Sequence, residues 1–379
     1  MKHTVSEVQL KNGVRGLLID VPGASVMSYL IQFRAGNRYV KSDDIYETAH
    51  IMEHMAFGAN AKFASANDFS AEFEQNGAYH NASTGDIGMI YMADCAEIEW
   101  ERILNLQKIA ITTPKFQQNE LEAESGNVQE ELTGLLSNHS RALWLRVGKA
   151  VGDPVMLDND RLKTIANITV DDIAEHYKRT HTLNNMRFVI AGPLKGRKRK
   201  TLEMLEGWRL PKGERLDVPQ DALYRSDPVL VPRKEVPNLI FGFGMFLNER
   251  IDDGDLDAMA ALNHILTGTL HSRILGQARQ RGLVYGMWSD TSAYDYMSEW
   301  SFGGQVSLAK AEKLFDIIVD ELRRVLDGKL SAKEVEAAQQ YALGKHQMAC
   351  QTVAQIAHWY SGRYFFDEQI DNFDYRPRA

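Results

Sequence analysis

Two histidines and a glutamate stand close together near the start of the chain, in the string His-Ile-Met-Glu-His at residues 50–54. On an α-helix, residues four apart lie on one face, so His50 and His54 can both direct a ring nitrogen at one metal ion. Glu53 lies beside them as a candidate base. A catalytic zinc site has three protein ligands and an open position for water. The string therefore predicts a zinc site that activates water, with a third ligand supplied from elsewhere.

An acidic segment at residues 120–131 can supply that third ligand. It is interrupted by one glycine, so we expect it to be mostly helical, and its glutamates are Glu120, Glu122, Glu124, Glu130 and Glu131. Glu124 and Glu131 are two helical turns apart and share a face, which Glu120 joins, whereas Glu130 is turned away by about 100°. An acidic run alone is more typical of a solvated face, so this interpretation depends on the histidines.

The histidine string needs a helix that is seated on a sheet. Ser42 or Asp43 can cap such a helix at its N-terminus, and Gly58 can end it. Apolar residues recur at helical spacing to form the buried stripe: Ile45, Ala49, Met52 and Ala56.

These features resemble the inverted-zincin metallopeptidases, the pitrilysin or M16 family, whose signature is His-x-x-Glu-His followed by a distant glutamate. Here 76 residues lie between His54 and Glu131. The resemblance implies that His50, His54 and Glu131 bind one zinc ion per chain. It implies that Glu53 is the general base that takes a proton from the zinc-bound water, and that Glu124 supports the site.

A second resemblance concerns residues 76–84, which are similar to the family's strand for an extended peptide substrate. The substrate-binding residues that it implies are Asn81, Ala82, Ser83 and Thr84. An exposed sheet edge suits this role because its unpaired backbone groups can hydrogen-bond any peptide. The alternative is an ordinary hairpin, since Gly and Asn are common turn residues. We expect His80 to be polar lining and not a ligand.

Residues 238–268 of the second half resemble a degenerate repeat of the first half. Aligned by its glycine at 268, it has His264 at the position of the second histidine, but Asn263 and Ala260 at the other two positions of the site. We therefore expect this half to bind no zinc and His264 to be a core residue.

The second half also contains Arg279 and the string Gly-Leu-Val-Tyr at 282–285. They resemble a family motif whose Arg and Tyr bind substrate and stabilise the tetrahedral oxyanion, and the matching residues are Arg279 and Tyr285. Both side chains are good donors to a developing negative charge. Arg281 remains a rival because Arg279 is one residue too close to Tyr285. The alternative is that these residues cap a helix and fill a core.

The length of 379 residues suits two domains. We expect an α+β fold of two related domains, each with an antiparallel-rich sheet and helices packed on one face. The predicted ranges are 1–212 for a zinc-binding catalytic domain, 213–232 for a proline-rich linker and 233–379 for a degenerate second domain. That second domain ends earlier than is usual in the family.

Composition narrows the function classes. The net charge of −8 argues against a nucleic-acid partner. No apolar stretch of 18 residues is present, so we expect no membrane span. The start lacks the apolar core of a secretory signal, and two cysteines are too few for a disulfide scaffold, so we expect a cytoplasmic protein.

Together these features predict a zinc-dependent endopeptidase that hydrolyses peptides or unfolded polypeptide segments. Family members of this size resemble one half of a clamshell, which implies a homodimer or a heterodimer with a related half-size subunit. Arg279 and Tyr285 would then reach the zinc of the partner chain. The alternative is a non-catalytic assembly subunit of the same fold. The presence of all five first-domain residues favours the enzyme.

Overall fold

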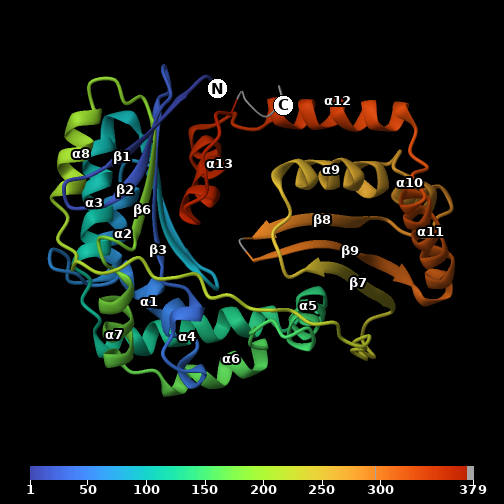
Figure 1. Cartoon of the computed structure of the whole chain (residues 1–379). Coiled ribbons are helices and arrows are strands. Elements are labelled where there is room, and N and C mark those ends of the chain that lie inside the picture. Colours follow the sequence, from blue (N-terminus) through green and yellow to red (C-terminus); the bar gives the residue numbers. More distant parts are fainter. Residues whose placement is uncertain (295, 374–379) are drawn as a thin grey trace. The chain divides into compact units, whose positions relative to one another are not determined.

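The computed structural model describes residues 1–294 and 296–373, and contacts divide the chain into two compact units (Figure 1). Unit 1 consists of Met1–Gly134, Asn159–Pro219 and Met348–Ala379, and unit 2 consists of Leu135–Asp158 and Gln220–Gln347. The α+β class is confirmed. The units differ from the predicted continuous ranges, because residues 135–158 belong to unit 2 and the residues from 348 onward belong to unit 1.

Unit 1 is built on a six-stranded sheet in the order β1-β2-β6-β3-β5-β4. Its strands are β1 (Thr4–Gln9), β2 (Arg15–Asp20), β3 (Val26–Arg34), β4 (Tyr79–Thr84), β5 (Gly88–Ala96) and β6 (Met186–Gly192). Neighbouring strands are antiparallel, except that β2 and β6 are parallel. The strand β4, which contains the predicted substrate residues, is the last in this order and pairs with β5.

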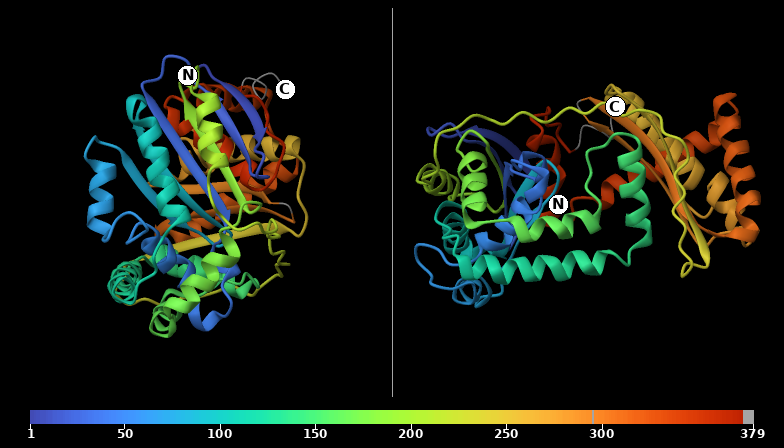
Figure 2. Two further views of the ribbon diagram at one scale, coloured as in Figure 1. Left: turned by 90° about the vertical axis from the view of Figure 1, so that its left-hand side faces the viewer. Right: turned by 90° about the horizontal axis from the view of Figure 1, so that it is seen from below.

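Helices cover both faces of this sheet. The α-helices of unit 1 are α1 (Thr48–Ala56), α2 (Ala66–Glu74), α3 (Trp100–Thr112), α4 (Gln118–Leu135), α6 (Asp158–Thr164), α7 (Val170–Thr180), α8 (Lys198–Glu206) and α13 (Val353–Phe365). Short 3-10 helices are formed by Asn37–Tyr39, Asp43–Ile45, Glu97–Glu99 and Ile165–Asn167. In the left view of Figure 2, α3 and α8 lie in front of the sheet and α13 lies behind it.

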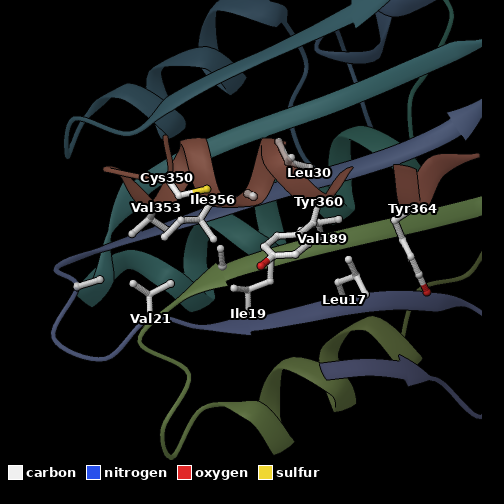
Figure 3. Packing of buried hydrophobic residues seen from close by; sticks show 13 residues of the cluster. Leu17, Ile19, Val21, Leu30, Val189, Cys350, Val353, Ile356, Tyr360 and Tyr364 are labelled. Carbon is white, nitrogen blue, oxygen red and sulfur yellow. The ribbon is translucent and has the colours of Figure 1, made fainter. Parts of the chain in front are cut away.

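The helix α13 makes one of the main apolar cores of unit 1 (Figure 3). Its residues Val353, Ile356 and Tyr360 are buried against Leu17 of β2 and Val189 of β6. Side chains alternate between the faces of a strand, so these two strand residues lie on the face away from their sequence neighbours. The expectation of helices on only one face is therefore wrong for this sheet, and the central strand β6 is buried along its whole length because both faces are covered.

Unit 2 has a three-stranded antiparallel sheet in the order β7-β9-β8. Its strands are β7 (Asn238–Leu247), β8 (Met287–Tyr294) and β9 (Met297–Ser307). Its helices are α5 (His139–Ala150), α9 (Asp253–Asn263), a π-helix (His264–Gly268), α10 (Arg273–Gln280), α11 (Leu308–Leu326) and α12 (Ala332–Met348). No membrane-crossing helix, by length and apolar character, occurs among residues 1–294 and 296–373.

The two faces of the β7 strand contact helices from different parts of the chain. Phe241 packs in a core with Leu314 and Ile317 of α11. Gly242 faces the other way, toward Trp144 of α5, and a Cβ atom at this glycine would lie 2.3 Å from the indole ring. One helix from each half of the sequence therefore belongs to the other unit. The helix α5, from the first half, packs on the sheet of unit 2, and α13, from the second half, packs on the sheet of unit 1.

The helix α1, which contains the predicted ligands His50 and His54, packs against α7, which contains the buried His176. The Nε2 of His176 lies 2.9 Å from the carbonyl oxygen of Ala35, to which it can donate, and Nδ1 faces Arg179 Nη2 at 3.4 Å. Nδ1 must then accept, so the ring is neutral. Burial, with the neighbouring Arg179 cation, lowers the pKa of His176 to about 4.

We expect the free energy of unfolding to fall as the pH drops from about 6.5 toward about 4. In this window the unfolded histidine binds a proton and the folded one does not, so the stabilisation is present above the unfolded pKa and is lost below it. One pKa unit is worth about 1.4 kcal/mol, which gives about 3 kcal/mol for His176. Urea unfolding at several pH values measures the slope. His176→Gln should reduce the dependence of the unfolding free energy on pH. The matched control is His358→Gln, which replaces an exposed histidine and should leave this dependence unchanged. Equal slopes in both variants would contradict the assignment of the pH dependence to His176.

Candidate metal centre

The helix α1 presents His50, Glu53 and His54, as the spacing predicts. It begins at Thr48, with Glu47 at the N-cap position. The predicted cap is wrong: the Ser42 side chain accepts a hydrogen bond from the Asp44 backbone N–H and caps the preceding 3-10 helix instead. At the other end the helix stops at Ala56, two residues before the predicted Gly58.

The helices α1 and α4 bring His50, His54 and Glu131 together. One potential ligand atom from each residue lies within 4.8 Å of the others, and this is the one such group of three among the residues that the structure describes. The Oε2 of Glu131 is 3.5 Å from His50 Nε2 and 3.9 Å from His54 Nε2. Two imidazole nitrogens and one carboxylate are a ligand set of catalytic zinc sites, so the donors fit zinc. The Glu131 side chain is 51% exposed, which leaves this side of the group accessible to water.

The structure separates the glutamates that share a face of α4. Glu120 lies at the end of α1, where its Oε1 accepts a hydrogen bond from the Ala59 backbone N–H at 2.5 Å. Glu124 lies 3.0 Å from His54 Nδ1, on the opposite side of the ring from Glu131. Of these three, Glu131 is therefore the residue in position to be a ligand.

Each histidine has a second carboxylate at its Nδ1 atom. For His54 this is Glu124, which also accepts from Asn127 Nδ2 at 3.0 Å. The hydrogen bond between His54 and Glu124 raises the pKa of the imidazole and lowers the pKa of the carboxyl. For His50 it is Glu47, whose Oε2 lies 3.0 Å from Nδ1. Carboxylates in this position orient metal-binding imidazoles and leave Nε2 for the metal.

Sequence reasoning missed Glu47 and its partner Arg161. The Glu47 carboxylate accepts from Arg161 Nε at 2.5 Å and from Nη2 at 3.0 Å. Burial would raise the pKa of Glu47, but the hydrogen bonds from His50 and Arg161 outweigh it and lower the pKa. A signal for Glu47 was present, because it lies three residues before His50 on the same helical face. Arg161 lies far along the chain, in α6, and no local pattern points to it.

The candidate base Glu53 is buried in α1, which packs against β4, the strand with the predicted substrate-binding residues. Burial raises the pKa of its carboxyl, and this outweighs the opposing effects of the Thr84 hydroxyl and of His50 and His54. A carboxyl with a raised pKa is better suited to accept and then return a proton near neutral pH.

The residues of the β4 strand keep their role as a prediction, and the structure gives their positions. Asn81 and Ser83 are exposed, whereas Ala82 is buried toward the core. His80 points to an aromatic cluster, where its ring stacks on Phe73 with the centroids 4.3 Å apart. Burial lowers the pKa of this histidine, as expected for a packed ring.

Arg279 and Tyr285 contact each other within unit 2. Arg279 donates a hydrogen bond to the Tyr285 carbonyl oxygen, and its guanidinium lies 4.9 Å from the centre of the Tyr285 ring. The Tyr285 residue is 89% exposed. The rival Arg281 instead donates to Gln277 Oε1 at 3.2 Å. Of the two arginines, Arg279 is therefore the one that contacts Tyr285, and a role of this pair in substrate binding stays a prediction.

His264, at the position that matches the second histidine, starts the π-helix of unit 2. Its half-buried ring stacks on Tyr341, with the centroids 3.9 Å apart. Its Nδ1 has no hydrogen-bond partner among the described residues.

Similar proteins include both named peptidases and a named non-peptidase. An "Uncharacterized zinc protease" of Rickettsia felis is 23% identical over 98% of this chain and 91% of its own length. The β subunit of the mitochondrial-processing peptidase of Rattus norvegicus is 27% identical, but the match spans 45% of this chain and only 35% of that relative. The "Non-peptidase homolog YmxG" of Helicobacter pylori is 23% identical over 72% of this chain and 64% of the relative.

Solved structures share the fold. The "peptidase M16 inactive domain" from Pseudomonas fluorescens superposes with a TM-score of 0.82 at 16% identity, over 99% of this chain and 90% of that one. A protease from Helicobacter pylori gives 0.81 at 18% identity, over 97% and 90%.

Family models match both halves of the chain. The model described as "Insulinase (Peptidase family M16)" matches residues 17–157, and "Peptidase M16 inactive domain" matches residues 167–341. The chain belongs to the peptidase M16 family.

Proposed function

We propose that this protein is a zinc-dependent endopeptidase that hydrolyses peptides or unfolded polypeptide segments. The observation that supports it most is the meeting of His50, His54 and Glu131 within 4.8 Å, with the Glu53 carboxylate on the same helix as the histidines. The name of the Rickettsia felis relative, a zinc protease, agrees with this chemistry.

The side chains divide the reaction between them. His50, His54 and Glu131 would hold zinc, which when bound polarises the scissile carbonyl and acidifies a water molecule. Glu53 takes the proton from the attacking water and later passes it to the leaving amine, while Glu124 keeps the ring of His54 in place.

The substrate-binding surface that we propose is the edge of β4. A peptide paired with this strand would hydrogen-bond through its backbone, with selectivity from the side chains of Asn81, Ala82, Ser83 and Thr84. The helix α1 packs against β4, so a peptide that follows β4 would pass the helix that carries the proposed base Glu53.

The test is a zinc assay combined with a quenched-fluorescent peptide library. The proposal expects about one equivalent of zinc per chain, cleavage of library peptides, loss of cleavage with a chelator and its return with added Zn²⁺. A protein that binds zinc fully but cleaves no member of the library would contradict the peptidase.

A second candidate function is a non-catalytic assembly subunit. It is favoured by the Helicobacter pylori relative that is named a non-peptidase homolog. This function expects stable association with another polypeptide and no cleavage of that polypeptide, whether or not zinc is bound. The zinc assay and the peptide library therefore separate the two functions.

We further propose a dimer, of two identical chains or of this chain with a related half-size subunit, in which Arg279 and Tyr285 complete the site of the partner chain. For two identical chains, mixing Glu53→Gln with Tyr285→Phe should restore activity, because each mixed dimer has one intact site. Removing one oxyanion donor costs about 10²–10³ in rate, so each variant alone is nearly inactive.

Random exchange of those chains should return about a quarter of the wild-type activity, since half of the dimers are mixed and each has one intact site of two. The activity is measured after mixing and re-equilibration, with each variant alone as the control. If the activity of the mixture equals the sum of the activities of the two variants measured alone, the sites are not shared between identical chains.

A further inference from the structure

A buried ion pair lies directly behind His50. Glu47 is 0% exposed, and its carboxylate accepts two hydrogen bonds from the fork of the Arg161 guanidinium. The Arg161 cation in turn lies 5.8 Å from the centre of the Tyr46 ring. The Oε2 atom of Glu47 is shared, because it also lies 3.0 Å from His50 Nδ1.

The position of Glu47 at the start of α1 does not explain this arrangement. It is the N-cap residue, yet its side chain makes no capping hydrogen bond to the helix. A buried ion pair is also a weak source of stability, because an apolar pair of similar volume is often as good or better. The carboxylate is therefore directed at the imidazole and the guanidinium, and not at the helix.

The contacts determine which nitrogen of His50 carries the proton. A carboxylate whose two oxygens are held by Arg161 offers only acceptor sites to the ring, so Nδ1 must be the donor. Nε2 then has its lone pair free, and this atom faces Glu131 Oε2 at 3.5 Å. We infer that Glu47, held by Arg161, is a positioning residue that fixes the tautomer and the orientation of His50 for zinc. The inference rests on the proposed function and extends it to a residue pair outside the signature string.

His54 provides the contrast within the same site. Its Nδ1 partner, Glu124, comes from α4 and is partly exposed. Glu47 is the N-cap residue of the helix that carries His50, and it is fully buried. Solvent reaches Glu124 more readily than Glu47, so we expect the loss of Glu47 to affect its histidine more than the loss of Glu124 affects His54.

The test measures zinc affinity, by competition with a chromophoric chelator, in full-length Glu47→Gln. A carboxamide can turn either its oxygen or its nitrogen to the ring, so it no longer enforces one tautomer. We expect zinc binding to weaken by about 10–100-fold, the usual cost of losing an outer carboxylate.

A second variant separates positioning from folding. The double substitution Glu47→Met with Arg161→Met replaces the ion pair by apolar groups, which we expect to preserve thermal stability. Zinc binding should still weaken by at least 10-fold. The matched control is Glu321→Gln in unit 2, a buried carboxylate bound by Gln277 and Arg324, which should leave zinc affinity unchanged.

A direct readout needs no zinc at all. The ¹⁵N spectrum of histidine-labelled, zinc-free protein, with the signal assigned from His50→Gln, should show the Nδ1–H tautomer in the wild type and a mixture of tautomers in both Glu47 variants. An Nε2–H tautomer in the wild type overturns the inference, as does wild-type zinc affinity in the folded double variant. If the wild type bound no zinc, the proposed function would fail, while the tautomer measurement would still decide the role of Glu47.

Discussion

Glu53→Gln should lower kcat for peptide hydrolysis by about 10²–10⁴-fold, the contribution of a positioned general base. The amide has nearly the same shape as the carboxyl but cannot take a proton from water. Because burial already raises the pKa of Glu53, a neutral side chain at this position should not weaken the fold. We therefore expect zinc content and the thermal unfolding midpoint to stay at wild-type values.

The measurement is single-peptide kinetics with metal analysis of the same samples. The matched control is Glu130→Gln, which removes an exposed carboxylate from α4 and should leave kcat unchanged. Turnover by Glu53→Gln at the wild-type rate would rule out this glutamate as the base. A loss of zinc together with activity would instead show that the variant acts through the metal.

Local periodicity was sufficient to predict which residues of the candidate site share a helix face. The four-residue spacing of His50 and His54 and the two-turn spacing of Glu124 and Glu131 follow from helix geometry, and the structure places each pair on a single helix, α1 or α4. Periodicity alone did not separate Glu131 from Glu120. That choice depends on where α4 crosses α1, which is a tertiary property.

The features that were missed depend on contacts between distant parts of the chain. Arg161 reaches Glu47 across 114 positions, so the pair has no pattern in sequence. The packing of α5 and α13 on the sheets of the opposite halves is equally non-local. A hydrophobic pattern shows that a helix has a face to bury but does not say which sheet will cover it.

The N-cap of α1 was predicted at the wrong residue. Ser42 is a favourable N-cap, and it does cap a turn, but the chain bends once more before α1 begins. That second start puts Glu47 immediately before the helix. The start of the helix was therefore predicted a few positions too early, and helix boundaries are the least reliable part of a prediction from propensity.

Glu131→Gln should weaken zinc binding by about 10²–10³-fold. Zinc sites with four protein ligands bind with about 10–16 kcal/mol, so one ligand is worth about 3–4 kcal/mol, and about 1.4 kcal/mol is a factor of ten in Kd. An amide oxygen is a poorer ligand than a carboxylate, and no other α4 carboxylate is within 4.8 Å of both histidines among the described residues. Activity should fall with zinc occupancy and return in part at high Zn²⁺.

Glu120→Gln is the control that makes this prediction specific to the ligand. Glu120 lies on the same face of the same helix, but its Oε1 accepts a hydrogen bond from the Ala59 backbone, and its Oε2 has no hydrogen-bond partner among the described residues. Its loss should lower thermal stability without changing the zinc Kd, whereas Glu131→Gln removes an exposed side chain and should change the Kd with little effect on stability. If both variants weakened zinc equally, the effect would come from the packing of α4, and Glu131 would lose its assignment as the third ligand.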